Sequence, residues 1–204
     1  MVNLNALLKE VYEVYPRGIF LEDETYKQRN EYLKREQKKE NTKKSDDFRV
    51  IYQNIKEIFD NYEVVNWSNI EEHPCFEFVI LLHKNQPILD DDTDLIHQLN
   101  GVRHDLFLYV SYISNYYCYY IRETKYSEES GEWSFKKIRL EDNQNIVALI
   151  QDMNTYLTNI GYELLSQEIL SYRLPDIDLE LVSFGAATIF HCLFTDLLDF
   201  ILKE

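Results

Sequence analysis

The chain has 204 residues and carries 36 acidic against 21 basic side chains, a formal net charge of -15. Nucleic-acid binders draw much of their affinity from cations that neutralise phosphates, so this balance argues against direct nucleic-acid binding and favours a basic partner. Because 45% of the residues are hydrophobic and no Gly-, Ser- or Pro-rich linker interrupts them, we expect a single globular domain over residues 1–204.

The chain also lacks the usual marks of export. No basic residue precedes the first apolar residues of Met1–Glu10, so we expect no signal peptide. The most apolar run, Phe76–Leu82, contains Glu77 and is far too short to span a bilayer. Three dispersed cysteines do not form a disulfide framework. These features predict a cytoplasmic protein without a membrane segment.

In the N-terminal half, the expected elements are an amphipathic helix over Leu4–Tyr15, a charged segment over Thr25–Lys44, a strongly amphipathic helix over Phe48–Tyr62 that begins after a cap at Ser45, and two strands over Val64–Trp67 and Cys75–His83. The charged segment has few apolar residues to bury, so we expect a poorly anchored helix or a mobile, partly disordered stretch. Its excess of lysine and arginine marks either a solvated face that pairs with the acidic body or an interaction site.

In the C-terminal half, the expected elements are a short helix over Asp90–Leu99, three strands over Leu106–Ile113, Tyr116–Tyr126 and Trp133–Leu140, a helix over Ile146–Ile160, a helical turn over Ser166–Tyr172, a strand or helix over Ala186–Phe194, and a short helix after Thr195. The predicted fold is α+β. A central, tyrosine-rich three-stranded antiparallel meander, with one or two N-terminal strands, is packed by the N- and C-terminal helices. The other face of the sheet is either covered or left as a functional surface.

The densest acidic cluster superficially resembles a calcium loop. Asp90, Asp92 and Asp94 match its first, third and fifth positions, but Leu95 stands where the turn needs glycine and Gly101 where a bidentate glutamate should close the site. No pair of histidines has zinc-site spacing. We therefore expect no metal and no cofactor, and assign the cluster to helix capping or to partner contact.

Catalytic motifs are missing as well. There is no nucleophile elbow and no phosphate-binding glycine loop. A cysteine and a distant histidine, or two of the many carboxylates, could still meet in the fold. A hydrolase with a composite carboxylate and histidine site thus stays an alternative.

Tyrosine is concentrated between Leu106 and Arg122. Strand alternation sends Tyr116 and Tyr120 to one face of the sheet, and Tyr117 and Tyr119 to the other. Exposed tyrosines are favoured at protein interfaces, whereas buried ones simply reflect the strand preference of aromatic residues. The sequence leaves both interpretations open.

The leading hypothesis is an acidic protein-binding module, most concretely a bacterial immunity protein that inhibits a basic toxin such as a nuclease. The residues expected to contact the partner are Asp90, Asp91, Asp92, Asp94, Tyr116, Tyr117, Tyr119, Tyr120, Glu128, Glu129, Asp176 and Asp178. Besides the hydrolase, a structural subunit of a larger assembly is the other alternative, and the oligomeric state is left open.

Overall fold

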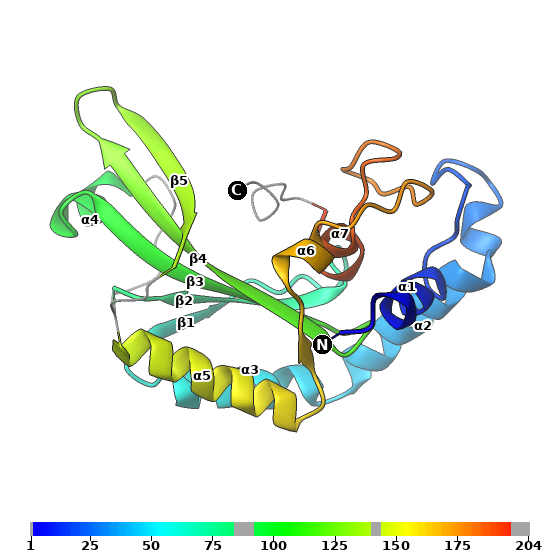
Figure 1. The fold of residues 1–204 in the computed structure, drawn as a ribbon, viewed down its shortest axis with the longest axis horizontal. Helices are drawn as coiled ribbons and strands as arrows, with labels where there is room; N and C mark the ends of the chain where they lie inside the picture. The colour runs from blue at the N-terminus through cyan, green and yellow to red at the C-terminus, as the bar shows by residue number, and fades with distance from the viewer. Residues whose placement is uncertain (1, 84–91, 140–143, 197–204) are drawn as a thin grey trace.

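The protein is built on one twisted antiparallel sheet, seen in a computed structural model that describes residues 2–83, 92–139 and 144–196 (Figure 1). Its meander comprises, in order, β1 (Glu63–Asn66), β2 (Cys75–Leu81), β3 (Val102–Ser111), β4 (Tyr116–Ser127) and β5 (Glu132–Ile138). A short strand, β6 (Glu163–Leu164), pairs parallel to the start of β4, whereas β5 pairs with the later part of β4.

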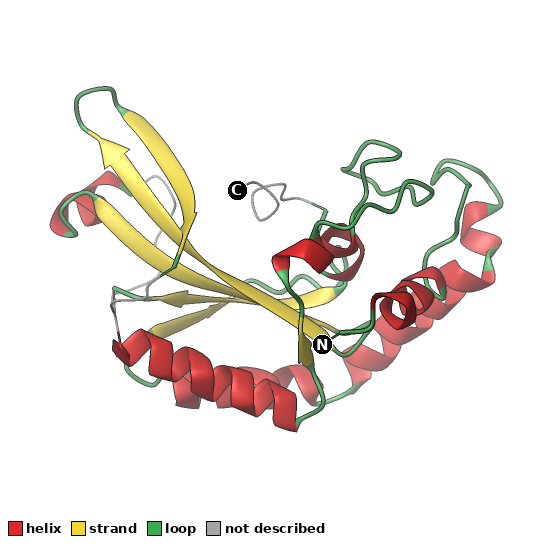
Figure 2. Ribbon diagram, in the orientation of Figure 1, coloured by secondary structure: helices red, strands yellow, loops and turns green. Residues whose placement is uncertain are grey.

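Helices cover both faces of this sheet, as the secondary-structure colouring in Figure 2 makes clear. The helical elements are α1 (Leu4–Tyr12), the 3-10 turn η1 (Tyr26–Gln28), α2 (Asn30–Lys44), α3 (Asp47–Ile58), α4 (Thr93–Gln98), α5 (Gln144–Asn159), α6 (Gln167–Leu170) and α7 (Ile189–Leu193). α3 and α5 lie on one face, and α1, α6 and α7 lie on the other.

The two faces of β3 belong to two separate apolar cores. Leu106 and Leu108 are buried in the core formed with α3 and α5. Phe107 and Tyr109 are buried in the core formed with α1 and α7. Because successive side chains of a strand point to opposite faces, covering both faces makes Leu106–Val110 of β3 a continuous apolar run.

The predicted α+β fold, with its antiparallel meander packed by helices, is confirmed. The ambiguous segment Ala186–Phe194 contains the helix α7, whose N-terminus is closed by a capping box between Thr188 and His191. The parallel strand β6 was not predicted. The expected helix after Thr195 lies largely outside the described residues, as do the beginning of the predicted Asp90–Leu99 helix and Leu140, the last residue of a predicted strand.

No helix among the described residues is both long enough and apolar enough to cross a membrane. That agrees with the absence of a long apolar run in the sequence.

A buried ion network ties β3 to β4 on the face that carries α7. Asp105 is 1% exposed, and its Oδ2 lies 2.8 Å from Nε of Arg103 and 3.5 Å from Nη2 of Arg122. The Arg122 guanidinium also lies over the ring of Phe107, 4.5 Å from its centroid. A carboxylate placed between two guanidinium groups compensates both charges inside the fold.

Replacing this carboxylate should destabilise the protein strongly. We expect Asp105→Asn to lower the free energy of unfolding by about 3 kcal/mol, because both arginines lose their buried counter-charge. The control is Glu123→Gln on the neighbouring strand, which removes the ion pairs to His104 and Lys125 near the surface and should cost less than about 1 kcal/mol. Urea denaturation of both variants at neutral pH measures the difference, and equal losses would contradict the role given to Asp105.

The charged segment forms a helix, α2, that buries none of its side chains. It is held instead by polar contacts to the body of the protein. The Lys38 ammonium donates a hydrogen bond to the carbonyl of Ile113, and the Lys43 ammonium lies 2.6 Å from a carboxylate oxygen of Glu71. The Arg35 guanidinium packs over the ring of Tyr15 at 4.8 Å. The expected pairing of its lysines with the acidic body is seen at Lys43, whereas the mobility of this segment stays a prediction.

Backbone amides of α2 should exchange with solvent faster than those of α3. Exposed ion pairs add little to local stability, whereas α3 buries Ile51 and Ile55 against the sheet. Hydrogen exchange followed by mass spectrometry compares the two helices in one sample. Equal protection of both helices would show that the contacts of α2 are stronger than surface pairs normally are.

Candidate functional site

The tyrosines expected at an interface are largely used inside the fold. Tyr116, Tyr117 and Tyr120 are 8%, 1% and 4% exposed, and Tyr119 is partly buried. The Tyr117 hydroxyl donates to Asn154 on α5, at 3.0 Å, and the Tyr120 ring stacks on Phe107 at a centroid distance of 4.9 Å. The expectation of an exposed tyrosine face on the central strand is therefore not met, because helices cover both sides.

The acidic residues predicted to join these tyrosines fall into two groups. Asp92 accepts a hydrogen bond from the backbone of Leu95 and caps α4, as the capping interpretation required, and Asp94 is exposed in the first turn. Glu128 and Glu129 are exposed in the β4–β5 turn nearby, where Glu128 lies 3.5 Å from the His97 ring of α4. These residues share one end of the sheet (Figure 1). Asp90 and Asp91 lie outside the described residues.

The second group, Asp176 and Asp178, has a structural role that the sequence did not indicate. Asp176 forms an ion pair with Arg17, and its carbonyl accepts a hydrogen bond from Gly18 at 2.7 Å. The Asp178 carboxylate accepts a hydrogen bond from the backbone of Leu21 at 2.8 Å. These contacts join the loop after α1 to the loop after α6 and leave both carboxylates only partly exposed.

The two joined loops carry an exposed apolar surface, here called the Phe20–Phe184 surface. Phe20, Leu181 and Phe184 are 57%, 58% and 46% exposed, and the two phenylalanine rings contact each other at a centroid distance of 4.7 Å. They border a cavity of about 530 Å³ that is also lined by Glu22 and Glu180. Both glutamates are exposed, and neither forms an ion pair with a described residue. Exposed apolar groups with an acidic rim are typical of a protein-binding site.

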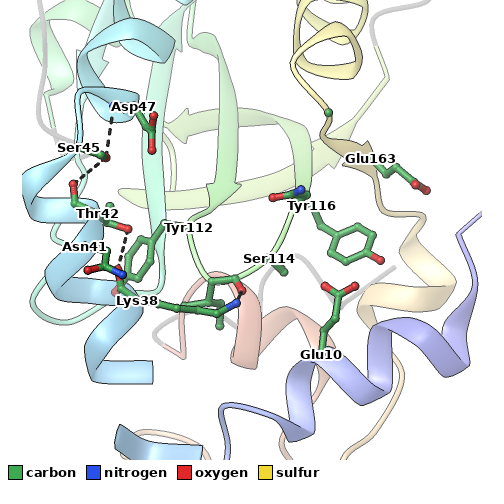
Figure 3. A pocket seen from close by; sticks show the side chains of 13 residues that line it. Glu10, Lys38, Asn41, Thr42, Ser45, Asp47, Tyr112, Ser114, Tyr116 and Glu163 are labelled. Atoms are coloured by element: carbon green, nitrogen blue, oxygen red, sulfur yellow. Dashed lines mark hydrogen bonds between the residues drawn. The ribbon is translucent and has the colours of Figure 1, made fainter. Parts of the chain in front are cut away.

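A larger and more polar groove lies between α1, α2 and the β3–β4 turn (Figure 3). It encloses about 640 Å³. The residues lining it come from distant parts of the chain, and those used below are Glu10, Lys38, Asn41, Asp47, Tyr116 and Glu163. Only Tyr116 among them was predicted as a site residue.

Electrostatics distinguish this groove from an ordinary surface depression. Partial burial raises the pKa of Glu10, the Lys38 ammonium opposes that shift, and the carboxylates of Glu13 and Glu163 add to it. Burial also raises the pKa of Tyr116, with Glu10 and Glu163 contributing. Glu10 and Glu163 therefore lie close enough to Tyr116 to act on it electrostatically.

One small cavity of about 140 Å³ brings a histidine together with several carboxylates, the groups that a composite hydrolase would need; its lining includes His191, Glu36, Glu71, Glu72, Glu180 and Asp196. No three His, Cys, Asp or Glu side chains of the described residues are arranged to hold a metal ion. Burial raises the pKa of all three cysteines, Cys75, Cys118 and Cys192, which keeps the thiols protonated and poorly nucleophilic. His191 is used in the capping box of α7.

Glu77 on β2 is the most perturbed carboxyl group with a defined value. Burial raises its pKa from 4.5 to about 7, while interactions with Tyr109 and Arg122 oppose the shift. It lies on the α7 face of the sheet, opposite Tyr109 in the register of β2 and β3. Its surroundings are aromatic and it does not line the groove of Figure 3.

The raised pKa of Glu77 should make stability fall as the pH rises. The folded protein holds this proton up to about pH 7, whereas the unfolded chain releases it near 4.5, so the stabilisation is complete below about 4.5 and is lost through about 7. At pH 8, Glu77→Gln should unfold with a free energy higher than the wild type by on the order of 2–3 kcal/mol, while the two proteins should be equal at pH 4. Urea denaturation at both pH values tests this, with the exposed Glu129→Gln as control. A difference that does not change with pH would contradict it.

Reasoning from the sequence did not identify the residues of the Phe20–Phe184 surface. Phe20, Leu181 and Phe184 belong to loops without regular periodicity, so no pattern marks them as exposed. The only signal was their position beside acidic residues, in Phe20-Leu21-Glu22 and Glu180-Leu181.

Comparison with known protein families, with curated proteins and with solved structures found no match for this chain.

Proposed function

We propose that the protein is an acidic binding module that docks onto a basic protein partner, with an immunity protein or inhibitor of a basic toxin as its most concrete form. The observation that carries the proposal is the Phe20–Phe184 surface. It combines exposed aromatic and aliphatic side chains with carboxylates at its rim, Glu22 and Glu180, that form no ion pair with any residue the structure describes. Aromatic anchors supply binding energy at interfaces, and complementary charges steer the partner and select it.

The loops that carry this surface are held in place before any partner arrives. The carboxylate of Asp178 binds the backbone of Leu21, and the carboxylate of Asp196 accepts a hydrogen bond from the backbone of Leu181 at 3.3 Å. The Phe20 and Phe184 rings contact each other across the two loops. A surface that is already ordered loses little conformational entropy on binding, which favours affinity.

The net charge supports a basic partner over an acidic or neutral one. Lys39 and Lys43 of α2 form ion pairs with glutamates near them, namely Glu36, Glu40 and Glu71, and so do not neutralise the acidic rim of the Phe20–Phe184 surface. A chain with a net charge of -15 repels other acidic proteins at long range and attracts cationic ones.

The test compares two exposed leucines that differ only in location. Leu181 on the Phe20–Phe184 surface is 58% exposed, and Leu33 on α2 is 52% exposed. Immobilised wild-type protein, Leu181→Asp and Leu33→Asp are each incubated with an extract of the native host. We expect wild type and Leu33→Asp to retain the same basic protein, released at high salt, and Leu181→Asp to lose it.

Binding constants of the purified partner then locate the interaction. Phe184→Ala should weaken binding by about 2 kcal/mol, mainly through faster dissociation, if the ring is an anchor. Glu22→Lys with Glu180→Lys should instead slow association and reduce its dependence on salt. Retention of the same protein by Leu181→Asp would overturn the assignment of this surface. A protein that stays alone in the host while turning over a metabolite would overturn the binding function itself.

A further inference from the structure

The groove of Figure 3 has the size and the walls of a small-molecule site. Its volume of about 640 Å³ lies within the range of pockets that hold small ligands. α2 forms one wall with Lys38 and Asn41, and Tyr116 and Glu163 lie on the opposite side (Figure 3). The groove and the Phe20–Phe184 surface share no lining residue.

Carboxylates outnumber cations along this groove, and they lie at both ends. Asp47, at the start of α3, occupies one end, and Glu10 with Glu163 lies toward the other (Figure 3). The cation among the lining residues is Lys38, whose ammonium already donates a hydrogen bond to the carbonyl of Ile113. The groove therefore presents separated negative charges that its own lysine does not fully balance.

The hydroxyl group of Tyr116 reaches the same groove. The Tyr116 side chain is 8% exposed, and among the described residues its hydroxyl has no hydrogen-bond partner. Figure 3 shows the Tyr116 ring beside the Glu10 carboxylate, and both Glu10 and Glu163 act electrostatically on the hydroxyl. The ring is largely buried while the hydroxyl reaches the groove, so this oxygen is available to a hydrogen-bond donor bound there.

The chemistry of these groups selects a cation that donates hydrogen bonds. Two carboxylates and a hydroxyl oxygen are acceptors, and an ammonium group carries three donors on a single charged atom. The side-chain oxygen of Asn41 adds a neutral acceptor on the opposite wall. A second ammonium group, a few methylenes away, could then reach the separate carboxylate of Asp47.

We propose that this groove binds a linear aliphatic polyamine, with one ammonium group between Glu10, Glu163 and Tyr116 and another near Asp47. The proposal does not depend on the protein partner, because it concerns different residues. A lysine side chain, which presents a single ammonium group, is the competing source of the same chemistry.

Titration calorimetry of the whole chain with spermidine tests the end of the site that Glu10, Glu163 and Tyr116 form. Glu10→Gln should weaken binding at least fivefold. Glu13→Gln, which removes the same charge one turn further along the chain but does not line the groove, should change affinity less than twofold. Both positions are exposed, so neither change should affect folding. Equal weakening by the two variants would show that spermidine is attracted only by the net charge, and would overturn the proposal.

The end of the site near Asp47 is tested with ligands that carry different numbers of ammonium groups. Asp47→Asn should weaken spermidine binding several-fold and leave the weaker binding of butylamine unchanged, whereas Asp46→Asn, outside the groove, should affect neither. Nα-acetyl-lysine methylamide should bind far more weakly than spermidine to the wild type. If it binds as tightly as spermidine, the groove recognises a single ammonium group and the polyamine assignment is wrong.

Discussion

The structure depends on the antiparallel pairing of β3 and β4, whose side chains are buried on both faces. The side chains of Leu106–Val110 on β3 and of Tyr116–Ile121 on β4 are divided between two apolar cores that lie on opposite faces of the sheet. The pairing also carries the buried carboxylate of Asp105 between Arg103 and Arg122. Since neither face is free, the centre of the sheet cannot act as a binding surface, and recognition is left to the loops and helices around it.

That constraint explains which parts of the fold could be predicted. Apolar residues at helical spacing identified α1, α3 and α5, because burial of one helix face produces that spacing. The meander was identified by runs of aromatic and β-branched residues separated by turn residues. Whether the tyrosines on the two faces of β4 are buried or exposed was harder to predict, since tyrosine is equally suited to a packed strand and to an interface. β6 is a two-residue strand formed by pairing with Tyr116 and Tyr117, and so short a segment has no periodicity of its own.

The residues that form the candidate sites could not be placed together from the sequence. Charge and tyrosine content favoured an acidic, aromatic binding surface, and Tyr116 does line the groove. Its neighbours Glu10 and Glu163 are far from it in sequence, and they meet it only because α1 packs against the sheet and β6 pairs with β4. Contacts between residues so far apart in the sequence produce no recognisable local pattern. A single sequence therefore could not show that these residues lie together.

The structure also shows why a count of charges overstates the acidity available to a partner. Asp176 and Asp178 bind Arg17 and the backbone of Leu21, Asp92 caps α4, and Glu71 holds the lysines of α2. Carboxylates used in this way stabilise the loops and helices that shape the surface. Their negative charge is already partly balanced by the groups that they bind, so it attracts a partner less strongly. Glu22 and Glu180 form no such pair among the described residues and stand beside exposed aromatic rings. The acidic residues that fix the loops and those that remain free for recognition are therefore different residues, although composition alone makes them equivalent.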